Sequence, residues 1–408
     1  MRQNKGLNIT LTVIRILVGL LFIFSGLVKA NDPLGLAYKM GEFFEVWAKE
    51  GYLPSLMHWL NGFALSFSVI MIAFEIVAGV ALIIGYRFKL FSYLIFLLTL
   101  FFTFLTAYAM FSGKIKECGC FGDCIKLQAN ESFMKDIILM ILITILLFFR
   151  KNVTQAFNNK IATFIMIAAF IFSFLFQWYA LKNLPFKDCL SYRVGNNILT
   201  EMTPGENYKP EEIKTVLVYE KNGEKKEFDL TNYPWQDSTW TFDTTINTVV
   251  KKAENEPSIL DFSITNYNGE NITNTILTYK GNLFLLFIKD VNEANTNHIE
   301  KLKSLIEACK KANIPFIALS ASNDIETNKF KEKHSIDIEF TSIDGTVCKT
   351  AMRSNPGLML LQNGTVKGKW SYNNYPKIDD LKLDLSNNNT SLFNAQTPVS
   401  NTDTTTLP

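Results

Sequence analysis

The sequence predicts a multi-domain protein, in which an α-helical membrane bundle is followed by an α/β domain outside the membrane. The chain has 408 residues, 48% hydrophobic content and a positive mean hydropathy, which is too apolar for a wholly soluble protein of this size. The long apolar stretches are confined to residues 1–181. Charge divides the chain at the same point, because residues 1–181 hold 15 Lys and Arg against 9 Asp and Glu, whereas residues 182–408 hold 25 against 29.

Five apolar stretches are predicted to cross the membrane, which needs about 20 residues for ~30 Å of hydrocarbon. The first is longer than the core of a signal peptide and lacks a good small-residue cleavage site, so we expect an uncleaved span. The fourth has only about 14 residues, although Lys135 and Arg150 could snorkel at its ends. The predicted spans are 8–30, 63–86, 88–111, 136–149 and 161–181.

Basic residues in the short connections predict the orientation. Arg2, Lys5, the Arg87-Phe88-Lys89 turn and residues 150–160 carry positive charge without acids, which marks the cytoplasmic side. Five spans then place the N-terminus in the cytoplasm and residues 182–408 outside. In a bacterial inner membrane this outer space is the periplasm, where disulfides form and persist.

Two ionisable residues lie inside the predicted spans, Arg15 in the first and Glu75 in the second. A charge inside a bilayer is costly unless it is paired or faces a cavity. Because the two spans are antiparallel, both residues are expected at similar depth, and the sequence predicts that Arg15 contacts Glu75. Such a pair could be a structural clamp, or a polar element of a quinone or proton site.

A dense cysteine cluster lies in the outer loop between the third and fourth spans. Three of the six cysteines, Cys118, Cys120 and Cys124, fall within seven residues. Disulfide exchange needs a thiolate, an accessible sulfur and a second cysteine, so these three are the candidate catalytic residues. Cys189, just beyond the last span, could pair with one of them.

Two other readings of the cluster stay open. A structural disulfide could pin the loop. Metal binding is the third possibility, but the Cys-x-Cys-x-x-x-Cys spacing offers three ligands with no evident fourth unless Cys189 completes the set. We therefore predict no metal site.

Strands and helices alternate in the outer part of the chain. A β-hairpin is predicted at 215–219 and 226–230, because Asn222-Gly223 is a typical hairpin turn. Further along, alternating and continuous apolar runs predict a compact α/β domain. Its expected elements are strands 261–264, 283–288 and 315–319, helices 294–312 and 325–334, and a hairpin at 357–361 and 366–370.

The predicted domain boundaries follow from these elements. They are a four-helix membrane domain at 1–150, a fifth span at 151–181, a linker with the β-hairpin at 182–256, the α/β domain at 257–385 and a tail at 386–408. The tail is rich in Ser, Asn and Thr, a composition typical of disorder.

The membrane part resembles a known family. Residues 15–29, followed by Asp32-Pro33, resemble the opening of DoxX-like membrane proteins, and Glu75-Ile-Val-Ala-Gly79 resembles their second signature. The Cys118-Gly-Cys120-Phe-Gly122 loop is similar to the branch that includes the methylamine-utilisation protein E, a membrane component linked to disulfide formation. The resemblance covers residues 8–150. It implies a four-helix core with a thiol redox role, and it makes a quinone a possible cofactor.

The outer domain resembles the thioredoxin-like fold over residues 257–385, because of its element order and of Pro356 directly before the last hairpin. In that fold a cis-proline borders the active site, so Asn355-Pro356 is a candidate cis bond. The place of the Cys-x-x-Cys pair reads Lys289-Asp-Val-Asn-Glu-Ala-Asn295, and no dithiol can form there. Cys309 is expected in the core, and Cys348 is either structural or a lone reactive thiol.

The leading interpretation is a membrane-bound thiol-disulfide redox protein, with an outward cysteine loop and a degenerate thioredoxin-like domain that binds a partner. The alternative is a non-enzymatic membrane-anchored scaffold with a structural disulfide. The expected partners are membrane lipid and an extracytoplasmic thiol protein. Nucleic acid is not expected, because the outer part is mildly acidic and contains no nucleic-acid-binding motif.

Overall fold

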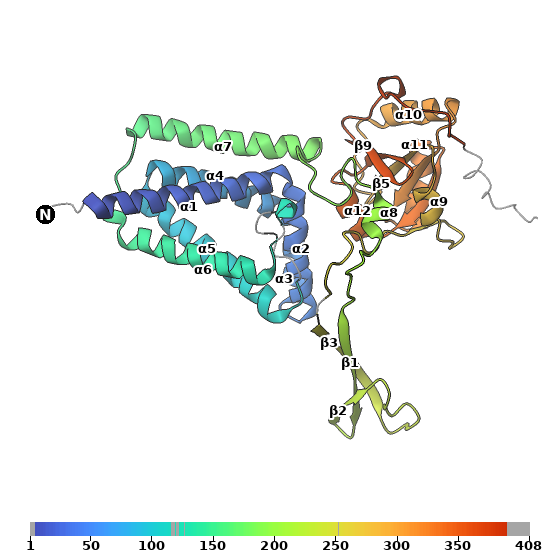
Figure 1. Cartoon of the computed structure of the whole chain (residues 1–408), viewed down its shortest axis with the longest axis horizontal. Helices are drawn as coiled ribbons and strands as arrows, with labels where there is room; N and C mark the ends of the chain where they lie inside the picture. The colour runs from blue at the N-terminus through green and yellow to red at the C-terminus, as the bar shows by residue number, and fades with distance from the viewer. Residues whose placement is uncertain (1–4, 116–118, 120–121, 126, 252, 390–408) are drawn as a thin grey trace, which may run out of the picture.

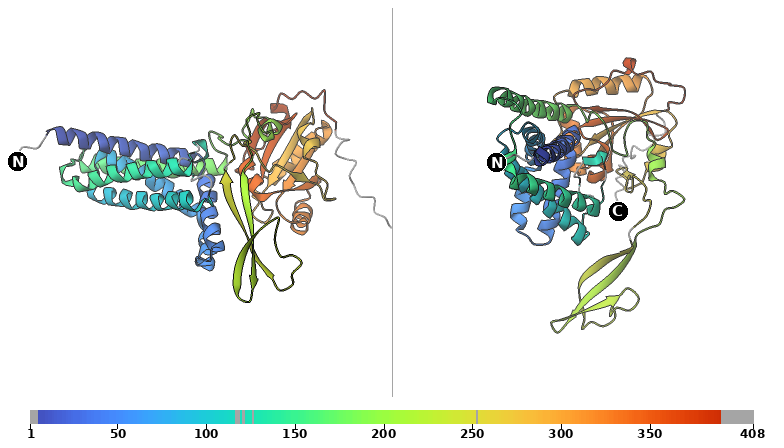
Figure 2. Two further views of the ribbon diagram at one scale, coloured as in Figure 1. Left: turned by 60° about the horizontal axis from the view of Figure 1, so that its bottom comes forward. Right: turned by 60° about the vertical axis from the view of Figure 1, so that its left-hand side comes forward.

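The structure, a computed structural model, describes residues 5–115, 119, 122–125, 127–251 and 253–389. It consists of a helical bundle, an α/β domain at one end of the bundle, and a narrow β-arm that projects away from both (Figures 1 and 2).

The bundle contains five long helices that lie side by side (Figure 1). Among the described residues, four of them are long and apolar enough to cross a membrane, which makes the chain a multi-pass membrane protein. The remaining helix, α6, has 20 residues and carries Glu131, Lys135 and Asp136 in its first half. It begins seven residues before the predicted fourth span. The five helices are α1 (Lys5–Asn31), α4 (Ala64–Ile84), α5 (Phe88–Ser112), α6 (Ala129–Phe148) and α7 (Asn159–Lys182).

Glycines set the register between α1 and α4. A Cβ atom at Gly79 would lie 2.7 Å from the carbonyl oxygen of Gly19, and one at Gly19 would lie 2.8 Å from that of Gly79. Only glycine permits such a close approach of two helix backbones. A Cβ atom at Gly26 would likewise lie 3.3 Å from that of Glu75. Glu75 therefore faces the later part of α1.

Two shorter helices that the sequence did not predict follow α1. α2 (Pro33–Lys49) runs across the end of the bundle (Figure 1), and α3 (Pro54–Asn61) follows it. The Asp32 side chain caps α2 by accepting a hydrogen bond from the Gly35 amide at 3.1 Å, and Pro33 suits the first helical position. Both features place Asp32 at the bundle end that carries the α/β domain.

The predicted hairpin is confirmed and extended by a third strand. β1 (Glu212–Lys221) and β2 (Glu224–Asp229) pair antiparallel, and the turn residues Asn222 and Gly223 have positive φ angles of 53° and 85°, as that turn requires. β3 (Thr241–Lys251) pairs with the other edge of β1. These strands form the β-arm (Figure 2).

The α/β domain is built on a six-stranded sheet of order β4-β7-β6-β5-β8-β9. β5, β6 and β7 are parallel, whereas β8, β9 and β4 run antiparallel to their neighbours. The strands are β4 (Ile264–Thr265), β5 (Asn282–Ile288), β6 (Phe316–Ser320), β7 (Glu339–Ile343), β8 (Gly357–Gln362) and β9 (Thr365–Ser371).

Helices cover both faces of this sheet. One core cluster joins α10 and α11 to β5 through Phe284, Leu286 and Ile288. The other joins α9 and α12 to the opposite side of β5, through Leu283, Leu285 and Phe287. This alternation is the period of a strand buried on both faces. The helices are α8 (Ile198–Met202), α9 (Thr273–Leu277), α10 (Ile299–Lys311), α11 (Asp324–His334) and α12 (Gly345–Ala351).

Most predicted elements of the α/β domain are confirmed. The strands at 283–288 and 315–319, the helix at 325–334 and the last hairpin agree with the structure within about two residues, and the Asn355-Pro356 bond is cis. The helix predicted from 294 begins only at Ile299, and the strand predicted at 261–264 is wrong, since only Ile264 pairs. The order β6-β5-β8-β9 with its strand directions resembles that of thioredoxin-fold proteins.

Candidate functional site

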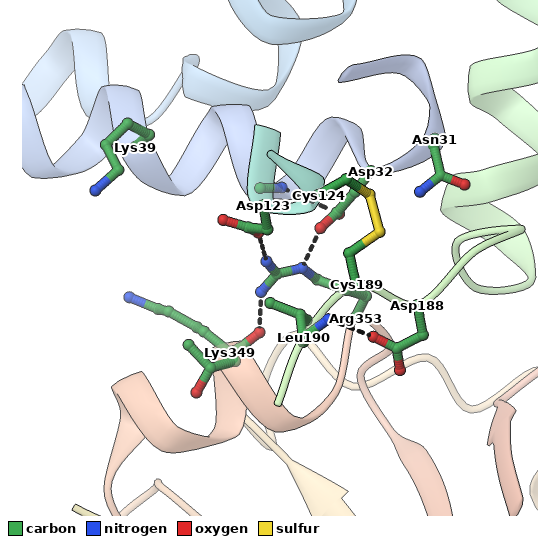
Figure 3. Close-up of polar contacts among 12 residues, drawn as sticks. Asn31, Asp32, Lys39, Asp123, Cys124, Asp188, Cys189, Leu190, Lys349 and Arg353 are labelled. Carbon is green, nitrogen blue, oxygen red and sulfur yellow. Dashed lines mark hydrogen bonds and ion pairs between the residues drawn. A yellow bond between two sulfur atoms is a disulfide. The ribbon is translucent and has the colours of Figure 1, made fainter. Parts of the chain in front are cut away.

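The cysteine loop is tied to the segment that follows the last membrane helix. Cys124 forms a disulfide with Cys189, 65 residues away, with 4.9 Å between their Cα atoms (Figure 3). The bond joins the α5–α6 loop to the start of the linker. Cys118 and Cys120 lie outside the described residues, so their role and their pairing stay predictions.

Arg353 of the α/β domain holds the same loop from the other side. Its Nε donates to Asp32 Oδ2 at 2.8 Å and its Nη2 donates to Asp123 Oδ2 at 2.7 Å, while Nη1 donates to the Lys349 carbonyl oxygen. Figure 3 shows the guanidinium between the two carboxylates, next to the disulfide. The Arg353 side chain is only 6% exposed, whereas Asp32 and Asp123 are 13% and 30% exposed, so a buried guanidinium joins two partly buried carboxylates between the two domains. We call this contact the Arg353 clamp.

There is little space around this clamp. A Cβ atom at Gly35 would lie 2.9 Å from Asp32 Oδ2 and 3.0 Å from Asp123 Oδ2. Glycine at this position therefore lets both carboxylates approach the first turn of α2. The sequence predicted no role for Asp123, Gly35 or Arg353.

Tyr38 of α2 adds an aromatic contact between the domains. Three cations of the α/β domain lie over its ring: Arg353 at 5.2 Å, Lys349 at 5.5 Å and Lys289 at 6.0 Å from the ring centre. Such cation–π contacts are favourable, more so where water is excluded. Burial raises the pKa of the Tyr38 hydroxyl, which therefore stays neutral at physiological pH.

The face of the α/β domain that meets the loop is the face that contains the cis-proline. Asn355 donates to the Asp290 carbonyl oxygen at 2.8 Å, and its own carbonyl accepts from the Asn295 amide at 2.9 Å. The segment that replaces the family's Cys-x-x-Cys pair thus lies beside Pro356. Lys289, the first residue of this segment, and Arg353, three residues before Pro356, both lie over the Tyr38 ring of α2, so the degenerate site faces the membrane domain.

The linker start is fixed by two further contacts. Lys369 on β9 forms an ion pair with Asp188, which precedes Cys189. The Asn31 side chain at the end of α1 donates to the Lys187 carbonyl oxygen at 2.8 Å and accepts from the Lys187 amide at 3.0 Å. The α/β domain and the helical bundle therefore both hold the segment that carries Cys189.

Burial affects the pKa of charged groups at the contact between the bundle and the α/β domain. It raises the pKa of the Asp32 carboxyl, although Arg353 acts in the opposite direction. Burial acts to lower the pKa of Arg353, but the two carboxylates together outweigh it and the pKa rises. The guanidinium therefore stays charged. Burial also lowers the pKa of Lys369, against the effect of Asp188.

The interaction predicted between Arg15 and Glu75 is wrong. Arg15 Nη1 donates to the Thr154 carbonyl oxygen at 3.0 Å, near the end of α4. Glu75 instead pairs with Lys29, with 2.6 Å between Nζ and Oε1. The reason is the glycine contact between α1 and α4, which shifts Glu75 toward the later part of α1.

Cys348 is a core residue of α12. It is 1% exposed, and Cys309 on α10 is fully buried as predicted. Burial raises the pKa of both thiols to about 12. A thiol with this pKa holds ~10³-fold less thiolate at neutral pH than one at the ordinary value of about 8.5. Among the described residues, no group of three or more metal-binding side chains occurs.

We therefore expect Cys309 and Cys348 to resist N-ethylmaleimide at pH 8 in the folded protein and to react after unfolding, as measured by mass spectrometry. Their folded-state pKa lies above the unfolded value, so the stabilisation from keeping them protonated is full at neutral pH and is lost as the pH rises from about 8.5 through 12. Fast labelling of Cys348 in the folded protein would instead indicate a reactive thiol.

Family models match two parts of the chain, the membrane bundle and the β-arm. Residues 7–150 match the family described as methylamine utilisation protein MauE, and residues 213–252 match a domain of unknown function, DUF8463, which coincides with the β-arm. A search of curated proteins gave no match.

Two solved structures are similar to part of the chain. A reduced Prx3 in complex with H₂O₂ from Vibrio vulnificus is 12% identical and covers 27% of this chain and 82% of its own, with a TM-score of 0.23. A candidate protein disulfide isomerase from Bacteroides thetaiotaomicron is 16% identical and covers 29% and 80%, with a TM-score of 0.23.

Residues 7–150 of this chain thus match the MauE family, and they are followed by an α/β domain that resembles thioredoxin-fold proteins.

Proposed function

We propose that this protein is a membrane-bound thiol-disulfide exchange protein whose reactive pair is Cys118 and Cys120. The observation that carries the proposal is the Cys124–Cys189 disulfide. It uses one of the three loop cysteines, so the remaining two are the pair that we assign to exchange. Gly119 between them has a positive φ of 66°, a conformation that glycine adopts without strain.

The α/β domain acts in this proposal as a docking module and not as an oxidoreductase. Its own site has no dithiol, and its cis-proline face lies against the cysteine loop through the Arg353 clamp. A thiol protein bound to this domain would have its cysteine next to the loop. The buried thiols of Cys309 and Cys348 take no part.

The cysteine loop and the α/β domain belong on the outer face of a bacterial inner membrane, with a quinone as the electron carrier in the lipid. Two observations support this orientation. A stable disulfide indicates an oxidising compartment such as the periplasm. The opposite end of the bundle carries Arg87, Lys89, Arg150 and Lys151, which is typical of the cytoplasmic side.

Trapping tests the exchange reaction. Replacing Cys120 by Ser should trap Cys118 in a mixed disulfide with a periplasmic thiol protein. Replacing Cys118 by Ser should trap Cys120 in the same way, because each variant lacks the cysteine that resolves the mixed disulfide. The complexes are detected on non-reducing gels and identified by mass spectrometry. Cys309→Ser, in the core of the α/β domain, is the control and should trap nothing. Absence of any adduct in both loop variants contradicts the proposal.

A second function is a scaffold in which every disulfide is structural. It is favoured by the same Cys124–Cys189 bond, which links two parts of the chain that also share an ion triad. In that case Cys118 and Cys120 would be as resistant to reduction as this bond.

A further inference from the structure

A buried ion pair and a second, partly exposed one share one cavity inside the helical bundle, since Lys135 of the second pair is 23% exposed. Lys29 Nζ lies 2.6 Å from Glu75 Oε1, and these side chains are 3% and 1% exposed. Lys135 Nζ lies 2.9 Å from Asp136 Oδ1. All four residues line a cavity of about 30 Å³ between α1, α4, α5 and α6, together with Ser25 and Thr99.

Hydroxyl groups extend both pairs. Ser25 donates to Glu75 Oε2 at 3.0 Å, and Thr106 donates to Asp136 Oδ2 at 3.1 Å. Each carboxylate therefore has a cation on one oxygen and a hydroxyl on the other. Charges inside a membrane domain are rare, and where they occur they often mark a proton or ion pathway.

A second, separate cavity of about 30 Å³ lies between this cluster and the cysteine loop. Lys29 and Phe102 line both cavities, and Thr106 and Gly119 line the second one. Gly119 is the residue between Cys118 and Cys120, and a Cβ atom there would lie 3.2 Å from the Lys39 side chain. The two cavities thus share the walls formed by Lys29 and Phe102, one lined by Glu75 and Asp136 and the other by Gly119 of the cysteine loop.

The volume of the cavities determines which molecules can occupy them. A water molecule needs about 10–15 Å³ of such space and two to four polar partners, so each cavity has room for one or two waters and none for a quinone ring. The polar partners are present in the two ion pairs and the two hydroxyls. Water bridges between these groups would make a continuous hydrogen-bonded path.

We propose that Glu75 and Asp136 form a proton-exchange site that serves the cysteine loop through these cavities. This inference rests on the proposed function. Oxidation of the two loop thiols breaks two S–H bonds, forms one S–S bond and releases two electrons and two protons. A lipid-soluble quinone accepts the two electrons and becomes a quinol by gaining two O–H bonds. The protons travel from the loop through the cavity waters to the carboxylates and onward to the quinone.

The test compares two oxidants on the full-length protein in detergent. Glu75→Gln and Asp136→Asn are each expected to slow oxidation of the reduced loop by a short-chain ubiquinone analogue at least tenfold. Exchange with hydroxyethyl disulfide, an aqueous oxidant that needs no path through the bundle, should stay within twofold of the wild type. Arg15→Gln is the matched control, because Arg15 is another charged residue of the bundle, on α1, but lines neither cavity. It should leave both rates within twofold.

The variant Lys29→Gln with Glu75→Gln guards against misfolding, because it removes both charges of one pair and leaves no buried ion without a partner. It should fold and show the same slow quinone reaction. Unchanged quinone rates in the folded variants overturn the inference, and so does a wild type that exchanges with hydroxyethyl disulfide but cannot reduce the quinone. A wild type that reacts with neither oxidant overturns the proposed function as well.

Discussion

Replacing Arg353 by Met is expected to separate the α/β domain from the cysteine loop. The substitution leaves the Asp32 carboxylate, which is largely buried at 13% exposure, without its cation. Breaking a buried ion pair by removing one partner costs about 3–5 kcal/mol. The linker should become sensitive to protease while the bundle stays folded, as followed by limited proteolysis and thermal unfolding in detergent.

Two further variants make this prediction specific. Arg353→Lys should lose almost as much stability and protease resistance as Arg353→Met. Two nitrogens of the planar guanidinium contact two different carboxylates, and an ammonium cannot reproduce this geometry. Adding Asp32→Asn to Arg353→Met should restore part of the stability. Arg193→Met is the control, since Arg193 is an exposed arginine that donates to Asn196. Wild-type protease resistance of Arg353→Met contradicts the clamp.

Loss of the Cys124–Cys189 disulfide is the second large effect. Cross-linking residues 65 apart removes loop-closure entropy from the unfolded chain and stabilises by about 4 kcal/mol in the chain-entropy description. Cys124→Ser should therefore lower the unfolding midpoint by on the order of 10 °C. The change should be visible as a loss of thermal stability in detergent under non-reducing conditions.

The double variant provides the internal control. Cys189→Ser should have the same effect as Cys124→Ser, and the two together should cost no more than either alone, because both remove the same bond. Additive losses would mean that the two cysteines stabilise the protein through separate contacts.

The sequence was sufficient for the longest apolar elements but not for their register. The apolar runs of α1 and α4 and the continuous strand β5 are strong local signals. The pairing of Arg15 with Glu75 assumed that equal depth means contact. The actual partner, Lys29, follows from the approach of Gly19 to Gly79, which depends on the backbones of two helices and not on any local pattern.

The clamp could not be predicted for a related reason. Arg353 is 321 residues from Asp32 and 230 residues from Asp123, and nothing in its neighbourhood distinguishes it from other basic residues. The Asp32-Pro33 motif was noticeable, but only as a family feature. β3 was missed because both of its faces are exposed, so its residues show no burial pattern.

A redox titration of the six cysteines tests the central claim most directly. The protein is equilibrated in thiol-disulfide buffers of stepped potential, alkylated, and mapped by mass spectrometry. We predict that Cys118 and Cys120 change together, at a potential near that of periplasmic oxidants, about −120 to −200 mV, whereas Cys124–Cys189 stays oxidised to below about −300 mV. If Cys118 and Cys120 remain reduced throughout, or become reduced only together with Cys124–Cys189, the exchange function is contradicted.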